Sequence, residues 1–220
     1  MPKAIDTKYL LALNAHQKIG SQTLKKILAA FPDPAKLWQA SCGEIKGKLP
    51  EKIADLAIEA RSQYDPDKEV DKLKKYDVGY LTIFDADYPP LLKQIYDAPV
   101  VLYIRGSVEV LRRKSLAVVG SRKYSNYGKN ITYDLTKKLA SNNLVIVSGL
   151  ALGVDAFAHR AALDAGSQTI GVIGCGLDRI YPATNFALGR EMVERGGAII
   201  SEFPLGTPPM KFNFPARKYI

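Results

Sequence analysis

The sequence predicts an α/β fold in which a mostly parallel, doubly wound β-sheet follows a small all-α bundle. Two observations predict it. Apolar residues over positions 6–62 recur at the three- and four-residue spacing of short amphipathic helices. From residue 115 onward, short runs of Val, Ile and Leu alternate with helical segments, and such uninterrupted runs are typical of parallel strands buried on both faces.

The first segment, residues 1–65, is predicted to be helical. Its helices are TKYLLALNAH, SQTLKKILAAF, AKLWQAS and PEKIADLAIEARSQY, the second capped by Ser21 and the last opened by Pro50. The turns at Ile19-Gly20 and at positions 47–50 resemble those of helix-hairpin-helix and SAM-like bundles. We therefore expect a SAM-like or helix-hairpin-helix-like domain.

Residues 66–110 are predicted to be a connector whose strands extend the sheet. The stretch LTIFDADYPPLLKQIYDAP contains a strand, a Pro-Pro turn and a short helix, and PVVLYIRG is a strand that ends at Gly106.

Residues 111–220 are predicted to form the Rossmann-like part of the sheet. The strands are SLAVVG, LVIVSG, TIGVIGCG and AIISEF, and helices are expected near 126–141, 153–165 and 184–195. Strands that alternate with helices form right-handed βαβ units, so these strands are expected to lie parallel.

Composition excludes several classes of protein. A chain of 220 residues, 47% hydrophobic and 24% charged, buries a sizeable core and is neither a disordered tail nor a disulfide scaffold. No apolar run is long enough to cross a bilayer and the N-terminus is not a signal peptide, so we expect a cytoplasmic protein without a membrane partner. Cys42 and Cys175 lie far apart and are expected to be buried thiols.

The chain is cationic, and most of the charge follows the connector. The formal net charge is +9, of which residues 1–75 carry +4, residues 76–110 carry -3 and residues 111–220 carry +8. This distribution favours a polyanionic partner, although surface charge also serves solubility.

Ligands of such sheets bind at the carboxyl ends of the parallel strands. These ends carry Gly120-Ser121-Arg122-Lys123, Ser148-Gly149-Leu150-Ala151-Leu152-Gly153, Gly174-Cys175-Gly176-Leu177-Asp178 and Ser201-Glu202-Phe203-Pro204. Glycine permits close backbone approach, and free N–H groups at helix starts can hold a phosphate. Any sheet of this kind needs glycine in its strand-to-helix turns, but Arg122 and Lys123 add charge that the turns do not require.

Other kinds of site fit the residues poorly. The first loop, GSRKYSNYG, is not GxGxxG, no acidic residue follows the second strand, and no Walker A motif is present, so no dinucleotide cofactor is expected. There is no GxSxG elbow, and two histidines with two separated cysteines cannot form a zinc cluster, so we expect no catalytic residue and no metal. His16 is expected on the surface. Asp155 and His159 are expected to be a hydrogen-bonded pair that anchors their helix to the sheet.

Aromatic residues gather near the same loops: Tyr124, Tyr127, Tyr181, Phe203, Phe212 and Phe214. Cations interleaved with aromatic rings suit single-stranded nucleic acid, whose bases stack and whose phosphates pair with the cations. Some of these rings, Phe203 above all, could equally belong to the core.

Four motifs, VVGSRKYSNYG, SGLALGVDAFAHRAAL, GLDRIYPATN and SEFPLGTPPMKFNFPAR, follow one another in the C-terminal half. In this order and spacing they closely resemble the DNA-processing protein A family (DprA, also called Smf), strongly over 115–220 and weakly over the N-terminal bundle. The resemblance implies a binding protein and not an enzyme, which binds and protects single-stranded DNA and loads the recombinase RecA onto it during natural transformation. It also implies a homodimer of the full-length protein, with a self-association surface largely beyond residue 220.

The DNA-binding residues that the resemblance implies, with Lys123 added from the charge of the first loop, are Gly120, Ser121, Arg122, Lys123, Ser148, Gly149, Gly176, Leu177, Asp178, Tyr181, Asn185, Lys211, Phe214 and Arg217. Lys211 would contact a phosphate, Phe214 would stack on a base, and Arg217 would complete a basic rim. The surrounding segment, PLGTPPMKFNFP, is predicted to be extended because of its prolines.

The sequence departs from the family pattern at two places. Ala183 stands where a basic residue often follows the proline of YPxxN, so one phosphate contact fewer is expected. The chain ends in FPARKYI where the family continues with FPxRNR and an apolar strand, so we expect it to be incomplete at its C-terminus.

Two other functions stay open. The same Gly-rich loops could serve a nucleotide-binding or nucleotide-hydrolysing protein, with Glu202 as its candidate catalytic residue. The chain could also be an interaction module whose charge is incidental.

Overall fold

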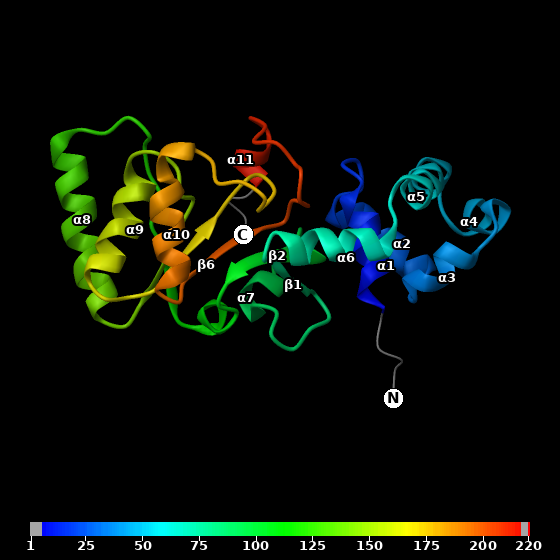
Figure 1. The fold of residues 1–220 in the computed structure, drawn as a ribbon, viewed down its shortest axis with the longest axis horizontal. Helices are drawn as coiled ribbons and strands as arrows, with labels where there is room; N and C mark the ends of the chain where they lie inside the picture. The colour runs from blue at the N-terminus through cyan, green and yellow to red at the C-terminus, as the bar shows by residue number, and fades with distance from the viewer. Residues whose placement is uncertain (1–5, 217–219) are drawn as a thin grey trace.

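The computed structural model describes residues 6–216 and Ile220, and a six-stranded sheet lies across its centre in the order β1-β2-β6-β5-β4-β3 (Figure 1). The strands are β1 (Gly79–Thr82), β2 (Val101–Gly106), β3 (Ser115–Ala117), β4 (Val145–Ser148), β5 (Thr169–Val172) and β6 (Ala198–Ser201). Strands β3 to β6 are parallel, while β2 pairs antiparallel with β6 and β1 antiparallel with β2. The predicted α/β fold with a mostly parallel sheet is confirmed.

Three crossover helices join the parallel strands: α8 (Asn126–Ser141), α9 (Val154–Asp164) and α10 (Phe186–Glu194). Because β3 to β6 lie in chain order, right-handed crossovers place these helices on one face of the sheet. The opposite face is covered by α7 (Pro90–Lys93) and the short 3-10 helix Glu109–Arg112, whose Leu92 and Val110 pack with Val172 and Ile200. Alternate residues of the strands therefore enter two different cores.

Strand β3 departs from the prediction of burial on both faces. All three of its residues are exposed, Leu116 by 41%. The reason is its position, since β3 is the last strand on its side of the sheet. Helix α8 lies beside it and exposes Tyr127, Ile131 and Leu135.

The N-terminal part is all helical and lies at the other end of the molecule from α8 (Figure 1). Its helices are α1 (Thr7–Ala15), α2 (Ser21–Ala30), α3 (Pro34–Gln39), α4 (Cys42–Lys48) and α5 (Glu51–Gln63), followed by α6 (Pro66–Lys75). None of the helices in the described ranges, 6–216, is long and apolar enough to cross a membrane. The likeness of this bundle to a SAM domain and the domain boundaries at 65 and 110 stay predictions.

Sequence reasoning missed α4 and α6, although both carry start signals. The Ser41 hydroxyl accepts a hydrogen bond from Glu44 N at 3.1 Å, and the Asp65 carboxylate accepts from Asp67 N at 2.9 Å, with Pro66 as the first residue of α6. A Ser-x-x-Glu box and an Asp-Pro pair are the patterns expected at helix N-termini.

Three expectations about single residues were wrong, and the first is His16, which was expected on the surface but is only 5% exposed. Ser21 does not cap α2, because Gly20 occupies the N-cap and the Ser21 hydroxyl accepts a hydrogen bond from Val100 N, at 3.3 Å. Cys42 is exposed at the start of α4, whereas Cys175 is buried as expected.

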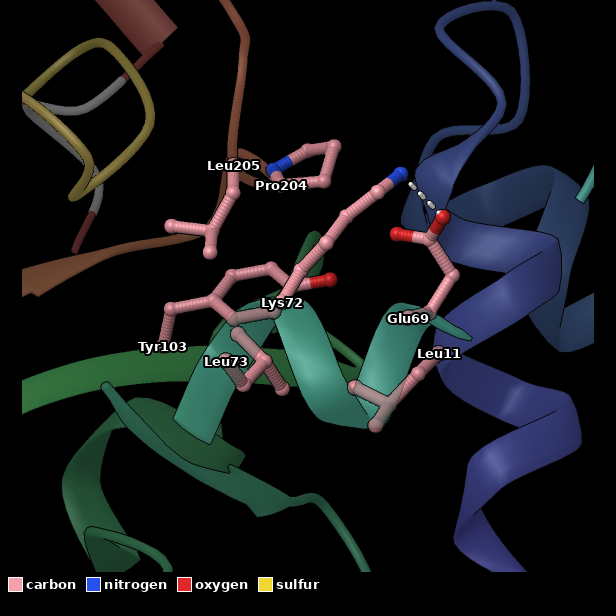
Figure 2. Close-up of a pocket in the computed structure, with 7 residues that line it drawn as sticks. All are labelled: Leu11, Glu69, Lys72, Leu73, Tyr103, Pro204 and Leu205. Carbon is pink, nitrogen blue, oxygen red and sulfur yellow. Dashed lines mark hydrogen bonds and ion pairs between the residues drawn. The ribbon is translucent and has the colours of Figure 1, made fainter. Parts of the chain in front are cut away.

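The bundle and the sheet meet around Tyr103 of β2 (Figure 2). Figure 2 shows its ring between Leu73 of α6 and Leu205, which lies on the segment after β6. Asn14 of α1 donates a hydrogen bond to the Tyr103 hydroxyl at 3.0 Å, and burial raises the pKa of that phenol. A single core cluster includes Leu11 of the bundle, Tyr103, and Ile199 of β6, so bundle and sheet share buried apolar surface.

Candidate nucleic-acid interface

The loop after β3 is held tightly against the start of α9. Val154 N donates a hydrogen bond to the Ser121 carbonyl oxygen at 3.3 Å, and the Ser121 hydroxyl accepts from Lys123 N at 3.1 Å. A Cβ on Gly120 would clash with the Val154 side chain, and one on Gly153 would clash with the Ser121 carbonyl. Gly153 also has a φ of 81°, which disfavours any other residue. Sequence reasoning placed Gly153 in the segment after the second parallel strand but did not count it among the site residues, although it fixes the position of this loop.

Arg122 and Tyr181, from two loops, and Phe214, from the short helix α11 (Asn213–Ala216), come together at the carboxyl ends of the parallel strands. The Arg122 guanidinium carbon lies 5.1 Å from the centre of the Phe214 ring. The Tyr181 ring lies 5.7 Å from the Phe214 ring, tilted by 34°. Arg122 and Tyr181 are exposed and Phe214 is half-buried, so we call these three residues the ring cluster.

Two further predicted cations are exposed. Lys123 adjoins Arg122 on the first loop, and Lys211 lies three residues before Phe214. Among the described residues, neither ammonium group has an ion-pair partner. Their charge is therefore not neutralised by a neighbouring carboxylate in the described part of the chain.

The segment between β6 and Phe214 is fastened to the loop after β5. Gly206 N donates to Asp178 Oδ1 at 2.8 Å, Gly176 N donates to the Thr207 carbonyl at 3.0 Å, and Asn213 Nδ2 donates to the Gly174 carbonyl at 3.0 Å. Burial alone would raise the pKa of Asp178, but the Gly206 hydrogen bond and the adjacent Arg179 guanidinium hold it below its ordinary value. Gly176 and Asp178 thus position the segment that carries Lys211 and Phe214.

The prediction that this segment is extended was wrong at its end. Helix α11 (Asn213–Ala216) contains Phe214 and Pro215. Proline is tolerated there because the first-turn N–H groups of a helix have no intrahelical acceptor. Lys211 lies in the turn that precedes this helix.

Other predicted site residues build the loops from within. Ser148 Oγ donates to the Val118 carbonyl at 2.6 Å, Asn185 Nδ2 donates to the Leu150 carbonyl at 2.9 Å, and Leu177 is 2% exposed. Gly149 is buried beside Ser148. Arg217 lies outside the described residues. The structure therefore brings Arg122, Tyr181 and Phe214 together but turns Ser148, Leu177 and Asn185 inward.

Asp155 and His159 serve to anchor α9. The Leu150 N–H donates to His159 Nε2 at 3.2 Å, and His159 Nδ1 lies 2.7 Å from the Thr169 hydroxyl, which donates to the Ile146 carbonyl. This arrangement fits the neutral tautomer protonated at Nδ1. Asp155 accepts from Ala151 N at 3.4 Å. Within the described ranges, no group of three or more His, Cys, Asp or Glu side chains could hold a metal ion.

Comparison with known proteins shows which family the chain belongs to. The family model described as DNA recombination-mediator protein A matches residues 79–220. The chain belongs to this family.

Protein Smf of Synechocystis is 34% identical over 219 residues, which are 96% of this chain and 54% of that protein. DNA processing protein DprA of Streptococcus pneumoniae is 45% identical over 139 residues, which are 63% of this chain and 49% of that protein. The chain thus spans about half the length of these curated relatives.

Solved structures show the same fold. The crystal structure of DprA from Streptococcus pneumoniae superposes with a TM-score of 0.79 at 33% identity and covers 98% of this chain and 74% of that one. A structure of DNA processing protein A from Helicobacter pylori, described by its single-stranded DNA binding mode, superposes with a TM-score of 0.55 at 36% identity, over 63% of this chain and 62% of that one.

Proposed function

We propose that this chain binds single-stranded DNA at the ring cluster and acts as a recombination mediator. The observation that carries the proposal is the contact of the Arg122 guanidinium with the Phe214 ring, together with the Tyr181 ring 5.7 Å from Phe214. A cation in contact with aromatic rings matches a strand whose phosphates and bases alternate along its length. The single-stranded DNA binding of the Helicobacter pylori relative supports the choice of ligand.

The electrostatics of the loops favour the same ligand. Lys123 and Lys211 stand beside the ring cluster without carboxylate partners among the described residues, and residues 111–220 carry a net charge of +8. Phosphate contacts of this kind are independent of base sequence and release counterions, so affinity should fall as salt rises.

The alternative of a nucleotide-hydrolysing enzyme relied on Glu202 beside the Gly-rich loops. Glu202 instead lines a separate cleft against the turn between α1 and α2. Its carboxylate therefore serves a different surface from the loops after β3, β4 and β5. The side-chain geometry therefore supports the proposal of a DNA-binding protein without catalytic residues better than that of a nucleotide-hydrolysing enzyme.

The finer role follows the family resemblance. We propose that the bound strand is protected and passed to the recombinase RecA during natural transformation, in the cytoplasm, and that the full-length protein is a homodimer. A RecA nucleation assay on single-stranded DNA coated with a single-strand binding protein tests the loading step. A shortened lag in RecA filament formation is the expected result.

The DNA-binding proposal is tested by fluorescence anisotropy with labelled oligo-dT at two salt concentrations. Each contacted phosphate should contribute a slope of about -0.7 in log affinity against log salt, so contacts from Arg122, Lys123 and Lys211 predict a slope of about -2. Arg122→Ala should weaken binding by about 1–3 kcal/mol and make the slope shallower. The matched control is Arg190→Ala, which removes an exposed guanidinium that pairs with Glu194 on α10.

Unchanged oligo-dT affinity in a folded Arg122→Ala protein would reject the site. No binding of the unmodified chain at low salt would reject the function.

A further inference from the structure

A cleft of about 350 Å³ lies between the N-terminal bundle and the segment that follows β6. One wall is the end of α1 and the turn to α2, including His16, Lys18 and Gly20, and the other includes Glu202, Met210 and Phe212. We call it the α1–α2 cleft. Its volume is in the range of pockets that enclose small organic groups.

The cleft adjoins the ring cluster through one short segment. Met210, Phe212 and Asn213 line the cleft, while Lys211 and Phe214, interleaved with them, belong to the proposed DNA site. A strand held by Arg122 and Lys211 therefore passes beside the mouth of the cleft.

Most half-buried or buried polar side chains of the cleft already have partners. Asn14 donates to the Tyr103 hydroxyl, Ser21 accepts from Val100 N, and Asn213 donates to the Gly174 carbonyl. His16, expected on the surface, is only 5% exposed, accepts from Lys18 N and lies 3.5 Å from a Glu59 carboxylate oxygen. These groups shape the walls.

Glu202 is different. Its half-buried carboxyl lines the cleft, and no described residue donates a hydrogen bond to it. Burial, with the nearby Asp97 carboxylate, raises its pKa. A carboxylate kept in such a place is suited to a ligand that brings its own N–H donors.

Much of the remaining lining is apolar, although Gln17, Lys18 and Thr207 also contribute to it. Phe212 is 70% exposed and Met210 is 43% exposed, while Ile19, which also lines the cleft, is buried. No side chain caps the start of α2, so N–H groups of its first turn keep donor capacity at this wall. Apolar surface for stacking, one carboxylate and backbone donors are the elements with which proteins hold an unstacked nucleobase.

Among the four DNA bases, the donor pattern selects guanine. Guanine offers two adjacent donors, N1–H and the N2 amino group, which fit the two oxygens of one carboxylate. Adenine and cytosine place a ring acceptor beside their amino group, and thymine places its one N–H between two carbonyl oxygens, so in each a lone pair opposes the second carboxylate oxygen. Guanine also carries O6, an acceptor for a backbone N–H.

We propose that the α1–α2 cleft binds one unstacked guanine of the strand held at the ring cluster, with the Glu202 carboxylate as the group that recognises it. This inference rests on the proposed DNA-binding function and adds a base preference to it. It also gives the N-terminal bundle a part in DNA binding, because α1 and the following turn form one wall.

The test compares the affinities of three oligonucleotides by fluorescence anisotropy at neutral pH. Each is about 15 nucleotides long, because single-stranded DNA sites of this kind span up to about 16 nucleotides. One is oligo-dT, the second has guanine at every third position, and the third has hypoxanthine in place of each guanine. Hypoxanthine lacks only the N2 amino group. We expect the guanine strand to bind about tenfold more tightly than oligo-dT, and the hypoxanthine strand to lie between them.

Glu202→Gln should abolish the preference and leave oligo-dT affinity equal to that of the unmodified chain or slightly higher. The matched control is Glu51→Gln, which removes one exposed negative charge on α5 and should keep the preference. Phe212→Ala should reduce it without affecting the folded state, because that ring is exposed.

Equal affinity for the guanine strand and oligo-dT would overturn the inference while leaving the proposed function intact. A preference that survives Glu202→Gln would overturn it as well. Failure of all three oligonucleotides to bind would instead reject the proposed function, and the base pocket with it.

Discussion

Phe214 is the residue on which the stacking role depends, because its ring contacts both the Arg122 guanidinium and the Tyr181 ring. Phe214→Ala should weaken oligo-dT binding by about 1–3 kcal/mol while the slope of log affinity against log salt stays unchanged, since no charge is removed. The competing role is packing, because a Cβ built on Gly174 would lie 3.3 Å from the Phe214 ring.

Thermal unfolding separates the two roles of Phe214. Phe214→Leu retains most of the apolar volume, so it should keep the melting temperature near that of the unmodified chain and still lose the stacking contribution. A leucine variant that binds oligo-dT normally would contradict the stacking role.

Glu202 should make the stability of the folded chain depend on pH. Burial raises the pKa of this carboxyl in the folded state, and Asp97 adds to the shift. The folded state therefore holds the proton more tightly than the unfolded chain, so stability is lost as pH rises from about 4, the ordinary value, through the raised folded pKa. Glu202→Gln should melt at a higher temperature than the unmodified chain at pH 7.

The gain in melting temperature from Glu202→Gln should shrink as the pH is lowered toward 4. There the Glu202 carboxyl of the folded chain is protonated and therefore as neutral as the glutamine that replaces it. Glu51→Gln, on an exposed carboxyl, serves as the control and should leave the melting temperature unchanged at both pH values. A gain that is equal at both pH values would show that lost packing or hydrogen bonding, and not ionisation, is the cause.

At the scale of elements, hydrophobic periodicity predicted the long regular helices and strands. It missed short helices that depend on a single capping residue and strand exposure that depends on neighbouring strands. Helix α8 spans the predicted residues 126–141, because its apolar spacing and strand flanks agree. Helix α4 is short and contains two glycines, Gly43 and Gly47, so its Ser41 cap was the stronger signal. The exposure of β3 could not be predicted, because it follows from strand order and not from composition.

The candidate site shows the same division. Arg122 was predictable as a site residue because charge on a strand-end loop is unusual. The roles of Ser148 and Asn185 were not predictable, because the sequence does not distinguish a polar side chain that faces a ligand from one that donates to a backbone carbonyl. The contact between Arg122 and Phe214 spans 92 positions of sequence and needs both loops in place. Helix α11 was missed because proline was taken to exclude a helix, which holds only beyond its first turn.

The position of the loop after β3 can be tested at Gly153. Gly153→Ala places a methyl group against the Ser121 carbonyl oxygen at a φ of 81°. The variant should lose about 1–3 kcal/mol of stability through backbone strain and should also bind oligo-dT more weakly, because Arg122 moves with its loop. The control is Gly166→Ala, which has a φ of 72° but open space around its Cβ.

Gly166→Ala should lower stability through the same backbone strain and leave oligo-dT affinity unchanged. Equal oligo-dT affinity in the two glycine variants, measured well below their melting temperatures, would contradict the role of Gly153 in placing Arg122.

At the scale of the whole molecule, the question is whether the helical bundle and the sheet unfold together. Their shared core cluster and the buried Asn14–Tyr103 hydrogen bond favour one cooperative transition. Trp38, the single tryptophan, lies on α3 and its fluorescence reports on the bundle, while far-UV circular dichroism reports on all helices. The two signals should give the same midpoint in urea.

Tyr103→Phe tests the coupling at its centre. The change removes only a hydroxyl, but it leaves the buried Asn14 amide without its acceptor, so the free energy of unfolding should fall by about 1–3 kcal/mol. Because the hydroxyl joins α1 to β2, the midpoints of both signals should shift by the same amount. Tyr133→Phe is the matched control, since it removes an exposed hydroxyl that donates to Asp164 and should change neither midpoint by much. If the Trp38 midpoint falls while the circular dichroism transition splits in two, bundle and sheet are separate cooperative units, and a DNA site formed between them would open whenever the bundle detaches.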